Sequence, residues 1–282
     1  MNVLVAGCGW LGSAVARSLV AQGHRVTGIR RNPERARELA AFGVAPLPLD
    51  LALPGAADRL PPDLDWIVAC QASSGEGVEA YRTAYLQVNE TLLEAARSRG
   101  VRGFVYTSST GVFGQKDGRD VDESTPPEPA SDSARILVEA ERLVLAAAGS
   151  CVSTRVVRLS GLYGPDRFGV IDRVRSGRLA LGPGDDAWTN WCHQEDAAAT
   201  VIASLERGRA GGLYHGSDAA PLRRRELVEW IAGKLGIEPP RSADASSARG
   251  ANRRILSERT RAELALTLRY PSVREGLAAC FR

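Results

Sequence analysis

Short apolar runs alternate with longer amphipathic stretches over the first two thirds of the chain. The apolar runs predict strands at 3–6, 24–29, 44–49, 66–70, 103–107 and 151–159. The stretches between them place apolar residues three and four positions apart and predict helices at 10–22, 33–42, 78–99 and 133–148. Strands separated by helices of this length are expected to pair in parallel through right-handed crossovers, which gives a doubly wound sheet.

The pattern changes after residue 165. A stretch rich in Gly, Arg and Pro is followed by predicted helices at 195–206 and 221–235, a late strand at 212–216, and short helices at 261–266 and 273–280. We therefore predict an α/β fold with a Rossmann domain and a small discontinuous C-terminal substrate lobe. The expected division assigns 1–165 and 190–218 to the Rossmann domain, and 166–189 and 219–282 to the lobe.

Composition narrows the class of protein. The 282 residues are 44% hydrophobic and 24% charged, and their net charge of +3, with scattered arginines, gives no reason to expect a nucleic-acid partner. No apolar run has the length of a membrane span, and no secretory signal is recognisable, so we expect a cytoplasmic protein. Five widely spaced cysteines and three histidines form neither a disulfide framework nor a metal site, and we expect buried, free thiols.

A glycine-rich turn separates the first predicted strand from the first predicted helix. It reads Gly7-Cys8-Gly9-Trp10-Leu11-Gly12, a GxGxxG pattern in the strand–turn–helix context that dinucleotide-binding turns require. Gly7 would allow the tight turn, Gly9 the close approach of a pyrophosphate, and Gly12 the packing of helix on strand. The turn, including Trp10 and Leu11, therefore predicts a dinucleotide site in which the phosphates face free helical N–H groups.

Two arginines follow the second predicted strand. Sites that prefer NAD place a carboxylate there for the ribose 2′-hydroxyl, whereas this chain has Arg30 and Arg31. A guanidinium can bind a 2′-phosphate through paired hydrogen bonds, so we predict NADP(H); the alternative is that both arginines face solvent. Asp50, after the third strand, is expected near the adenine amino group.

Several stretches together resemble the extended short-chain dehydrogenases/reductases of the NAD(P)-dependent epimerase/dehydratase type. They are VLVAGCGWLG (3–12), VN (88–89), YTSSTGVFG (106–114), RLSGLYGP (158–165) and WCHQEDA (191–197). The GxGxxG form resembles a divergent, atypical branch of that family. The resemblance implies a Rossmann domain with a C-terminal substrate lobe, and a homodimer formed through the helices within 78–99 and 133–148.

The resemblance also implies catalytic positions. Ser109 matches the hydroxyl that polarises a substrate carbonyl, and from its place after a strand it can donate to a developing oxyanion. The neighbouring Ser108 is expected among the cofactor-binding residues. A hydroxyl that only caps a loop is the alternative for Ser109.

The family's Tyr-x-x-x-Lys pair is missing. Ser131 stands at the tyrosine position and Arg135 at the lysine position. A serine hydroxyl is a poor proton donor near neutral pH, and an arginine can hold the nicotinamide ribose but cannot exchange a proton.

Another group must supply the proton, or the chain does not reduce carbonyls in the usual way. Tyr163 is the main candidate beside Ser131. The other candidate proton donors are Tyr81, Tyr85, His193, Asp132 and Lys116.

These features predict an NADP(H)-dependent oxidoreductase or epimerase-like enzyme. Its substrate would be a small carbonyl or hydroxyl compound or a nucleotide sugar. The arginines at 167, 173, 175 and 178 suit an anionic substrate and equally a solvated helix face. The alternative function is a catalytically inactive NADP(H)-binding sensor or regulatory protein.

Overall fold

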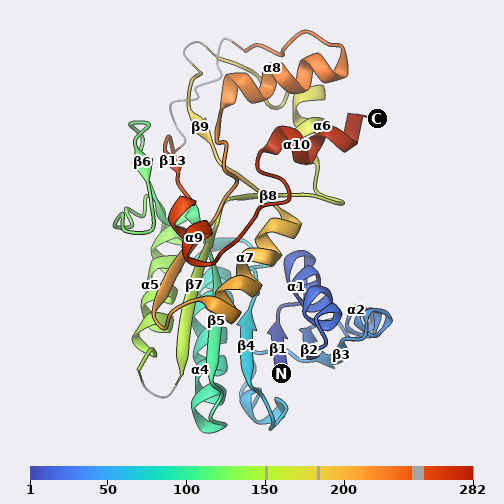
Figure 1. The fold of residues 1–282 in the computed structure, drawn as a ribbon, viewed down its shortest axis with the longest axis vertical. Coiled ribbons are helices and arrows are strands. Elements are labelled where there is room, and N and C mark those ends of the chain that lie inside the picture. Colours follow the sequence, from blue (N-terminus) through green and yellow to red (C-terminus); the bar gives the residue numbers. More distant parts are fainter. Residues whose placement is uncertain (150–151, 183–184, 243–250, 282) are drawn as a thin grey trace.

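A seven-stranded parallel sheet forms the centre of the computed structural model, which describes residues 1–149, 152–182, 185–242 and 251–281. The strand order is β11-β7-β5-β4-β1-β2-β3 (Figure 1). The strands are β1 (Asn2–Ala6), β2 (Arg25–Arg30), β3 (Ala45–Pro48), β4 (Trp66–Ala69), β5 (Gly103–Ser109), β7 (Ser153–Leu159) and β11 (Gly212–Gly216). The predicted doubly wound Rossmann sheet is confirmed, including its late strand.

Helices cover both faces of the sheet. Helices α1 (Trp10–Ala21) and α7 (Gln194–Arg207) lie together on one face, and α4 (Val88–Ser98) and α5 (Asp132–Ala146) cover the other. Side chains of β1 alternate between the two layers: Val3 and Val5 pack with α1 and α7, while Leu4 and Ala6 pack with α4 and α5. Burial on both faces explains why the strands read as continuous apolar runs.

The direction of winding reverses between β1 and β4. Strand β1 pairs with β2 on one side and β4 on the other, all in parallel. In sheets of this kind, ligands bind outside the carboxyl ends of the strands at such a switch point. Figure 1 shows the C-terminal helices beyond those ends, so a ligand at the switch point would lie between sheet and lobe; the place outside the carboxyl ends of β1, β2 and β4 is called the crevice below.

The lobe has its own apolar cluster. Helices α6 (Gly169–Arg175), α8 (Arg224–Leu235) and α10 (Val273–Ala278) supply most of its buried side chains. Short strand pairs join it to the sheet: β8 (Gly161–Tyr163) with β10 (Trp191–His193), and β9 (Trp188–Thr189) with β12 (Leu222–Arg223).

One part of the C-terminal segment returns to the sheet. Strand β13 (Arg254–Ile255) pairs with β6 (Asp120–Val121). Helix α9 (Glu258–Glu263) follows, and Leu264 packs among the side chains of α1 and α7. The chain therefore crosses the gap between lobe and sheet several times.

Two predicted helices are less regular than expected. The stretch 78–99 consists of α3 (Gly77–Tyr81), a π-helix (Arg82–Gln87) and α4, and the stretch 33–42 of α2 (Pro33–Arg37) followed by a 3₁₀ helix (Glu38–Phe42). Gly43, in the left-handed region at φ 73°, ends the second of these. The π-helix contains Tyr85, and such turns are frequent at functional sites.

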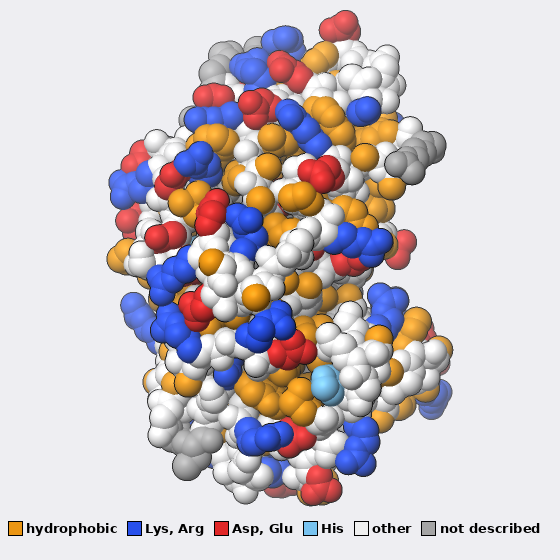
Figure 2. Space-filling model, in the orientation of Figure 1, with side chains coloured by type: hydrophobic (Ala, Val, Ile, Leu, Met, Phe, Trp, Pro, Cys, Tyr) orange, Lys and Arg blue, Asp and Glu red, His pale blue; other side chains and the backbone are white. Residues whose placement is uncertain are grey.

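Charges of both signs are mixed on the surface (Figure 2), and most of the described cysteines are buried. Basic and acidic side chains are interspersed on the face drawn in Figure 2. No helix within the described ranges is long and apolar enough to cross a membrane. Cys8, Cys70 and Cys192 are buried free thiols as predicted, Cys280 is exposed, and Cys151 lies outside the described residues.

Candidate functional site

The three glycines of the first turn have different surroundings. Gly7 has φ 78°, and a Cβ added there would lie 2.5 Å from the Cα of Gln71. A Cβ at Gly12 would lie 2.3 Å from the carbonyl oxygen of Gly7, so the helix could not pack as it does. At Gly9 the nearest atom would be 3.9 Å away, which leaves room above the backbone. The turn therefore has tight packing below Gly7 and Gly12 and open space at Gly9.

The N-terminus of α1 can receive an anion. Gly9 caps the helix without a side chain, and the first turn, all of it described, contains no Asp or Glu. The first N–H groups of a helix have no acceptor within it, and the helix dipole is positive at this end. This turn and the cradle at Gly9 fit the pyrophosphate of a nicotinamide dinucleotide.

Arg30 is attached to the glycine turn. Its guanidinium donates to the Cys8 carbonyl, to the Ser13 hydroxyl at 3.1 Å and to the Arg35 carbonyl at 3.1 Å, and it pairs with Glu38 at 3.2 Å. These contacts join β2, α1 and α2. Arg30 therefore holds the turn in place with most of its donors.

Arg31 spans the crevice instead. It is exposed, and its guanidinium donates to the hydroxyl of Ser74 in the loop after β4. Because β1 lies between β2 and β4, this contact crosses over the end of β1, beside the glycine turn. The carboxylate of Asp50 accepts from the N–H of Ala52 at 3.0 Å, beyond the end of β3.

Ser109 and Ser108 point to different partners. Ser109 ends β5, is half-buried, and its hydroxyl oxygen accepts from the N–H of Gly111 at 3.0 Å. Its own proton is thus available for a substrate oxygen. The Ser108 hydroxyl instead donates at 2.6 Å to Glu141, which forms a buried ion pair with Arg158. Ser108 is therefore held in the protein core by a bond to Glu141, and its hydroxyl proton is not free for a cofactor.

Ser131 and Arg135 lie at the start of α5, where the resemblance places the family's tyrosine and lysine. Ser131 is the N-cap, and its hydroxyl accepts from the N–H of Ala134 at 3.2 Å. Arg135 is exposed and pairs with Asp132 at 2.9 Å. Within the described ranges, no hydrogen bond joins either side chain to Ser109. Both residues have local partners that account for their positions.

Tyr163 is buried where β8 packs against the lobe. Only 1% of it is exposed, and its hydroxyl lies 3.5 Å from the carbonyl of Ser272. Burial and then the charge of Asp218 raise the pKa of Tyr163 far above its ordinary value. These surroundings favour packing of β8 against α10 over proton transfer.

Two of the alternative proton donors, His193 and Tyr85, also differ in their surroundings. His193 caps α7, with Nδ1 accepting from the N–H of Glu195 at 3.3 Å, and burial lowers its pKa. Tyr85 is closer to the crevice, because its hydroxyl accepts from the N–H of Ser73 at 3.4 Å, next to the serine that Arg31 reaches. Burial raises the pKa of Tyr85.

Trp10 connects the glycine turn to the lobe. Its indole N–H donates to the carbonyl of Pro165 at 2.7 Å, and the guanidinium of Arg167 lies 4.8 Å from the ring centroid. The Gln194 amide donates to the Trp10 carbonyl at 2.8 Å, whereas Leu11 is buried between α1 and α7. Gln194 was not predicted, because only the fold brings α7 to this turn.

Arg253 is a second residue that the sequence did not indicate. It is 9% exposed, and its guanidinium donates to the carbonyl of Thr110, the residue after Ser109. It stands in a loop-like stretch beside Arg254, and nothing in that pattern distinguishes a buried arginine from a solvated one.

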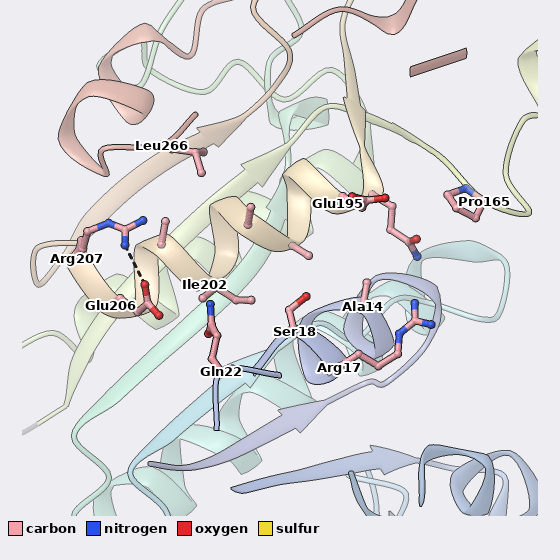
Figure 3. Close-up of a pocket in the computed structure, with 14 residues that line it drawn as sticks. Ala14, Arg17, Ser18, Gln22, Pro165, Glu195, Ile202, Glu206, Arg207 and Leu266 are labelled. Atoms are coloured by element: carbon pink, nitrogen blue, oxygen red, sulfur yellow. Dashed lines mark hydrogen bonds and ion pairs between the residues drawn. The ribbon is translucent and has the colours of Figure 1, made fainter. Parts of the chain in front are cut away.

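A groove of about 580 Å³ runs between α1 and α7 and is lined at one end by Pro165 and Gln194, the two residues that contact Trp10 (Figure 3). Ala14, Arg17 and Ser18 line it from α1, opposite Ile202 and Glu206 of α7. None of the predicted site residues lines it. The groove lies in the helical layer, on the side of the sheet covered by α1 and α7.

Comparison with known proteins agrees with this architecture. Residues 3–215 match the model of the NAD dependent epimerase/dehydratase family. Protein YeeZ of Escherichia coli K12 is 30% identical over 96% of this chain and 96% of its own length. A 3-diazoavenalumate denitrifying reductase from a Streptomyces species is 30% identical over 98% of this chain and 99% of its length.

A solved structure extends the likeness in fold. The dTDP-glucose 4,6-dehydratase DesIV of Streptomyces venezuelae, with NAD and TYD bound, has 23% identity and a TM-score of 0.84 over 100% of this chain and 96% of that one. With the sheet order, the glycine turn and the family match in agreement, the chain belongs to the NAD-dependent epimerase/dehydratase family of extended short-chain dehydrogenases/reductases.

Proposed function

We propose that the protein is an NADP(H)-dependent oxidoreductase or epimerase-like enzyme. Its substrate would be a small carbonyl or hydroxyl compound or a nucleotide sugar. The observation that carries the proposal is the switch point, where the open backbone at Gly9 follows β1 and the exposed guanidinium of Arg31, bonded to Ser74, follows the neighbouring parallel strand β2. Residues 1–165 and 190–218 would form the cofactor domain, and 166–189 and 219–282 the substrate lobe.

The cofactor roles follow from these contacts. Backbone N–H groups of Trp10, Leu11 and Gly12 would receive the pyrophosphate at the start of α1. Arg31 would bind a 2′-phosphate, because its guanidinium is exposed and ends over the crevice. Arg30 would support it by holding the turn, and Asp50 would meet the adenine.

Ser109 would bind the substrate oxygen. A nicotinamide cofactor, when bound, would supply or accept the hydride. The Ser109 hydroxyl, oriented by the N–H of Gly111, can donate a hydrogen bond where negative charge develops on the substrate.

The proton would come from a donor other than the missing tyrosine. The Ser131 hydroxyl caps α5, and Tyr163 is buried against the lobe. We favour Tyr85, whose hydroxyl lies at the loop after β4. Arg135 would reach the nicotinamide ribose only after leaving its exposed pair with Asp132.

The inactive NADP(H)-binding sensor is the second candidate. The observation that favours it is that the side chains of Ser131 and Arg135 both bond to neighbouring residues of their own helix start. Neither side chain is then free to replace the tyrosine and lysine of the family's proton relay. We further propose a cytoplasmic homodimer assembled through α4 and α5, which light scattering of the purified protein would test.

Turnover separates the two candidates. The purified protein is incubated with NADPH and a panel of aldehydes, ketones and nucleotide sugars, and reduced nicotinamide is followed by absorbance. The enzyme predicts loss of absorbance with at least one substrate, and a rate that falls about 100-fold or more in Ser109→Ala. Tight NADPH binding without turnover on any member of the panel would favour the sensor.

A further inference from the structure

Arg253 is a buried cation without a carboxylate partner in the described part of the chain. Its one hydrogen bond runs from Nη2 to the Thr110 carbonyl at 2.6 Å, and its Nε is buried and unpartnered. Burial alone lowers its pKa to about 10, with no neighbouring charge contributing. At neutral pH the group remains a cation, and burying a cation is costly unless something compensates it.

The other buried arginines of the sheet are compensated. Arg158 forms two hydrogen bonds with Glu141, both side chains being 3% exposed. All three nitrogens of Arg155 donate to oxygens of Gly208 and Ser153. Arg158 keeps one unpartnered nitrogen, Nη1, but its charge faces a carboxylate. Among these three, only Arg253 combines a buried charge with neither a carboxylate partner nor a full set of carbonyl acceptors within the described ranges.

The hydrogen bond to Thr110 places Arg253 beside the carboxyl end of β5. Its backbone is fixed by Asn190, whose amide donates to the Arg253 carbonyl at 3.0 Å. Thr110 directly follows Ser109 at the end of β5. A second unsatisfied group adjoins: the carbonyl of Gln115 accepts from the N–H of Asn252, and both side-chain amide atoms of Gln115 are buried without a partner in the described ranges.

We propose that Arg253, with Gln115 beside it, binds an anionic group of the substrate, a carboxylate or a phosphate, next to the oxygen that Ser109 receives. The proposal rests on the carbonyl chemistry proposed above and deepens it. A guanidinium and an amide N–H are the donors that such anions accept from. The substrate is then a compact oxo acid or a phosphorylated carbonyl compound in which charge and carbonyl are close together.

The test measures ligand affinity, independently of turnover. Pyruvate, acetoacetate, glycerone phosphate and the neutral 2-butanone are titrated by calorimetry into the protein saturated with NADP⁺. The two carboxylates and the phosphate distinguish the two sources of charge. The variants are Arg253→Met, Arg253→Lys as a charge-retaining substitute, and Arg254→Met as the matched control, since Arg254 is an exposed neighbour paired with Asp120.

At least one anionic probe should bind the wild type more tightly than 2-butanone. That preference should fall roughly 10- to 100-fold in Arg253→Met, the range for hydrogen bonds to a charged group. It should persist in Arg254→Met and return in part in Arg253→Lys. Without ligand, the melting temperature of Arg253→Met should equal or exceed that of the wild type, because an uncompensated charge is removed.

Two results would overturn the proposal. One is a wild type that shows no preference for any anionic probe; the other is an Arg253→Met protein that keeps the preference. A lower melting temperature with an unchanged preference would identify Arg253 as a support for the Thr110 carbonyl. A parallel NADPH titration and turnover assay of the wild type keep the two proposals apart, since failure of the proposed function appears there as absent cofactor binding or absent turnover.

Discussion

Replacement of Gly12 by alanine tests how the glycine turn is built. The new Cβ would lie 2.3 Å from the carbonyl oxygen of Gly7 and 3.3 Å from the Cβ of Cys70. The obstructing oxygen belongs to the backbone, so α1 and β1 must separate. Gly7 cannot retreat freely, because the backbone of Gln71 occupies the space that a Cβ at Gly7 would need.

The magnitude follows from two opposing effects. Alanine in a helix is favoured over glycine by about 1 kcal/mol. Overpacking a tight contact costs typically 1–3 kcal/mol, and a backbone obstacle belongs at the upper end of that range. We therefore expect Gly12→Ala to lower the free energy of unfolding by about 1–2 kcal/mol and to weaken NADPH binding more than 10-fold.

Two matched substitutions separate stability from binding. Gly9→Ala meets no atom nearer than 3.9 Å, so its stability should stay within about 0.5 kcal/mol of the wild type while NADPH binding weakens at least 10-fold. Gly233→Ala, at an exposed position of α8 with nothing within 4 Å of the added Cβ, should gain roughly 0.5–1 kcal/mol and leave binding unchanged.

Urea unfolding followed by circular dichroism gives the stabilities, and quenching or enhancement of NADPH fluorescence gives the affinities. A Gly12→Ala protein as stable as the wild type would refute the packing argument. A Gly9→Ala protein that binds NADPH normally would refute the assignment of the cradle.

Three further predictions concern the interior and the crevice. Glu141→Gln should lower the free energy of unfolding by about 3–5 kcal/mol, because Arg158 stays buried without its charged partner. Replacing both residues by apolar ones of similar size should restore most of that stability. A single variant with the urea midpoint of the wild type would contradict this. Burial raises the pKa of Asp218 to about 7, so the contribution of this carboxyl to stability is full below pH 3.8 and is lost as the pH rises towards 7. Asp218→Asn should therefore be more stable than the wild type at pH 8. A melting temperature with the same pH profile in both proteins would contradict this. Tyr85→Phe should lower turnover at least 10-fold while NADPH affinity stays within about twofold, and full activity would exclude Tyr85 as the donor.

The regular parts of the fold could be predicted because their signals are local. The inner strands of the sheet are buried on both sides, so they appear as apolar runs, and the glycine turn is identified by its flanking strand and helix. The short pairs β6–β13 and β9–β12 could not be predicted. Each has two residues per strand, and its partner lies far away in the sequence.

The candidate site was predictable only in part. Residue identity points to Arg30 and Arg31, but only the structure separates the arginine that holds the turn from the one that crosses the crevice. Ser108 and Ser109 are neighbours with opposite surroundings, because successive side chains of a strand point to opposite faces. Arg253 carried no signal, since its burial depends on contacts with β5 and Asn190.

Side-by-side titration with NADPH and NADH tests the central claim most directly. The wild type should bind NADPH at least 10-fold more tightly than NADH. Arg31→Ala should remove that preference by weakening NADPH alone, whereas Arg30→Ala should weaken both cofactors because it releases the turn. Equal or tighter binding of NADH by the wild type would contradict the account.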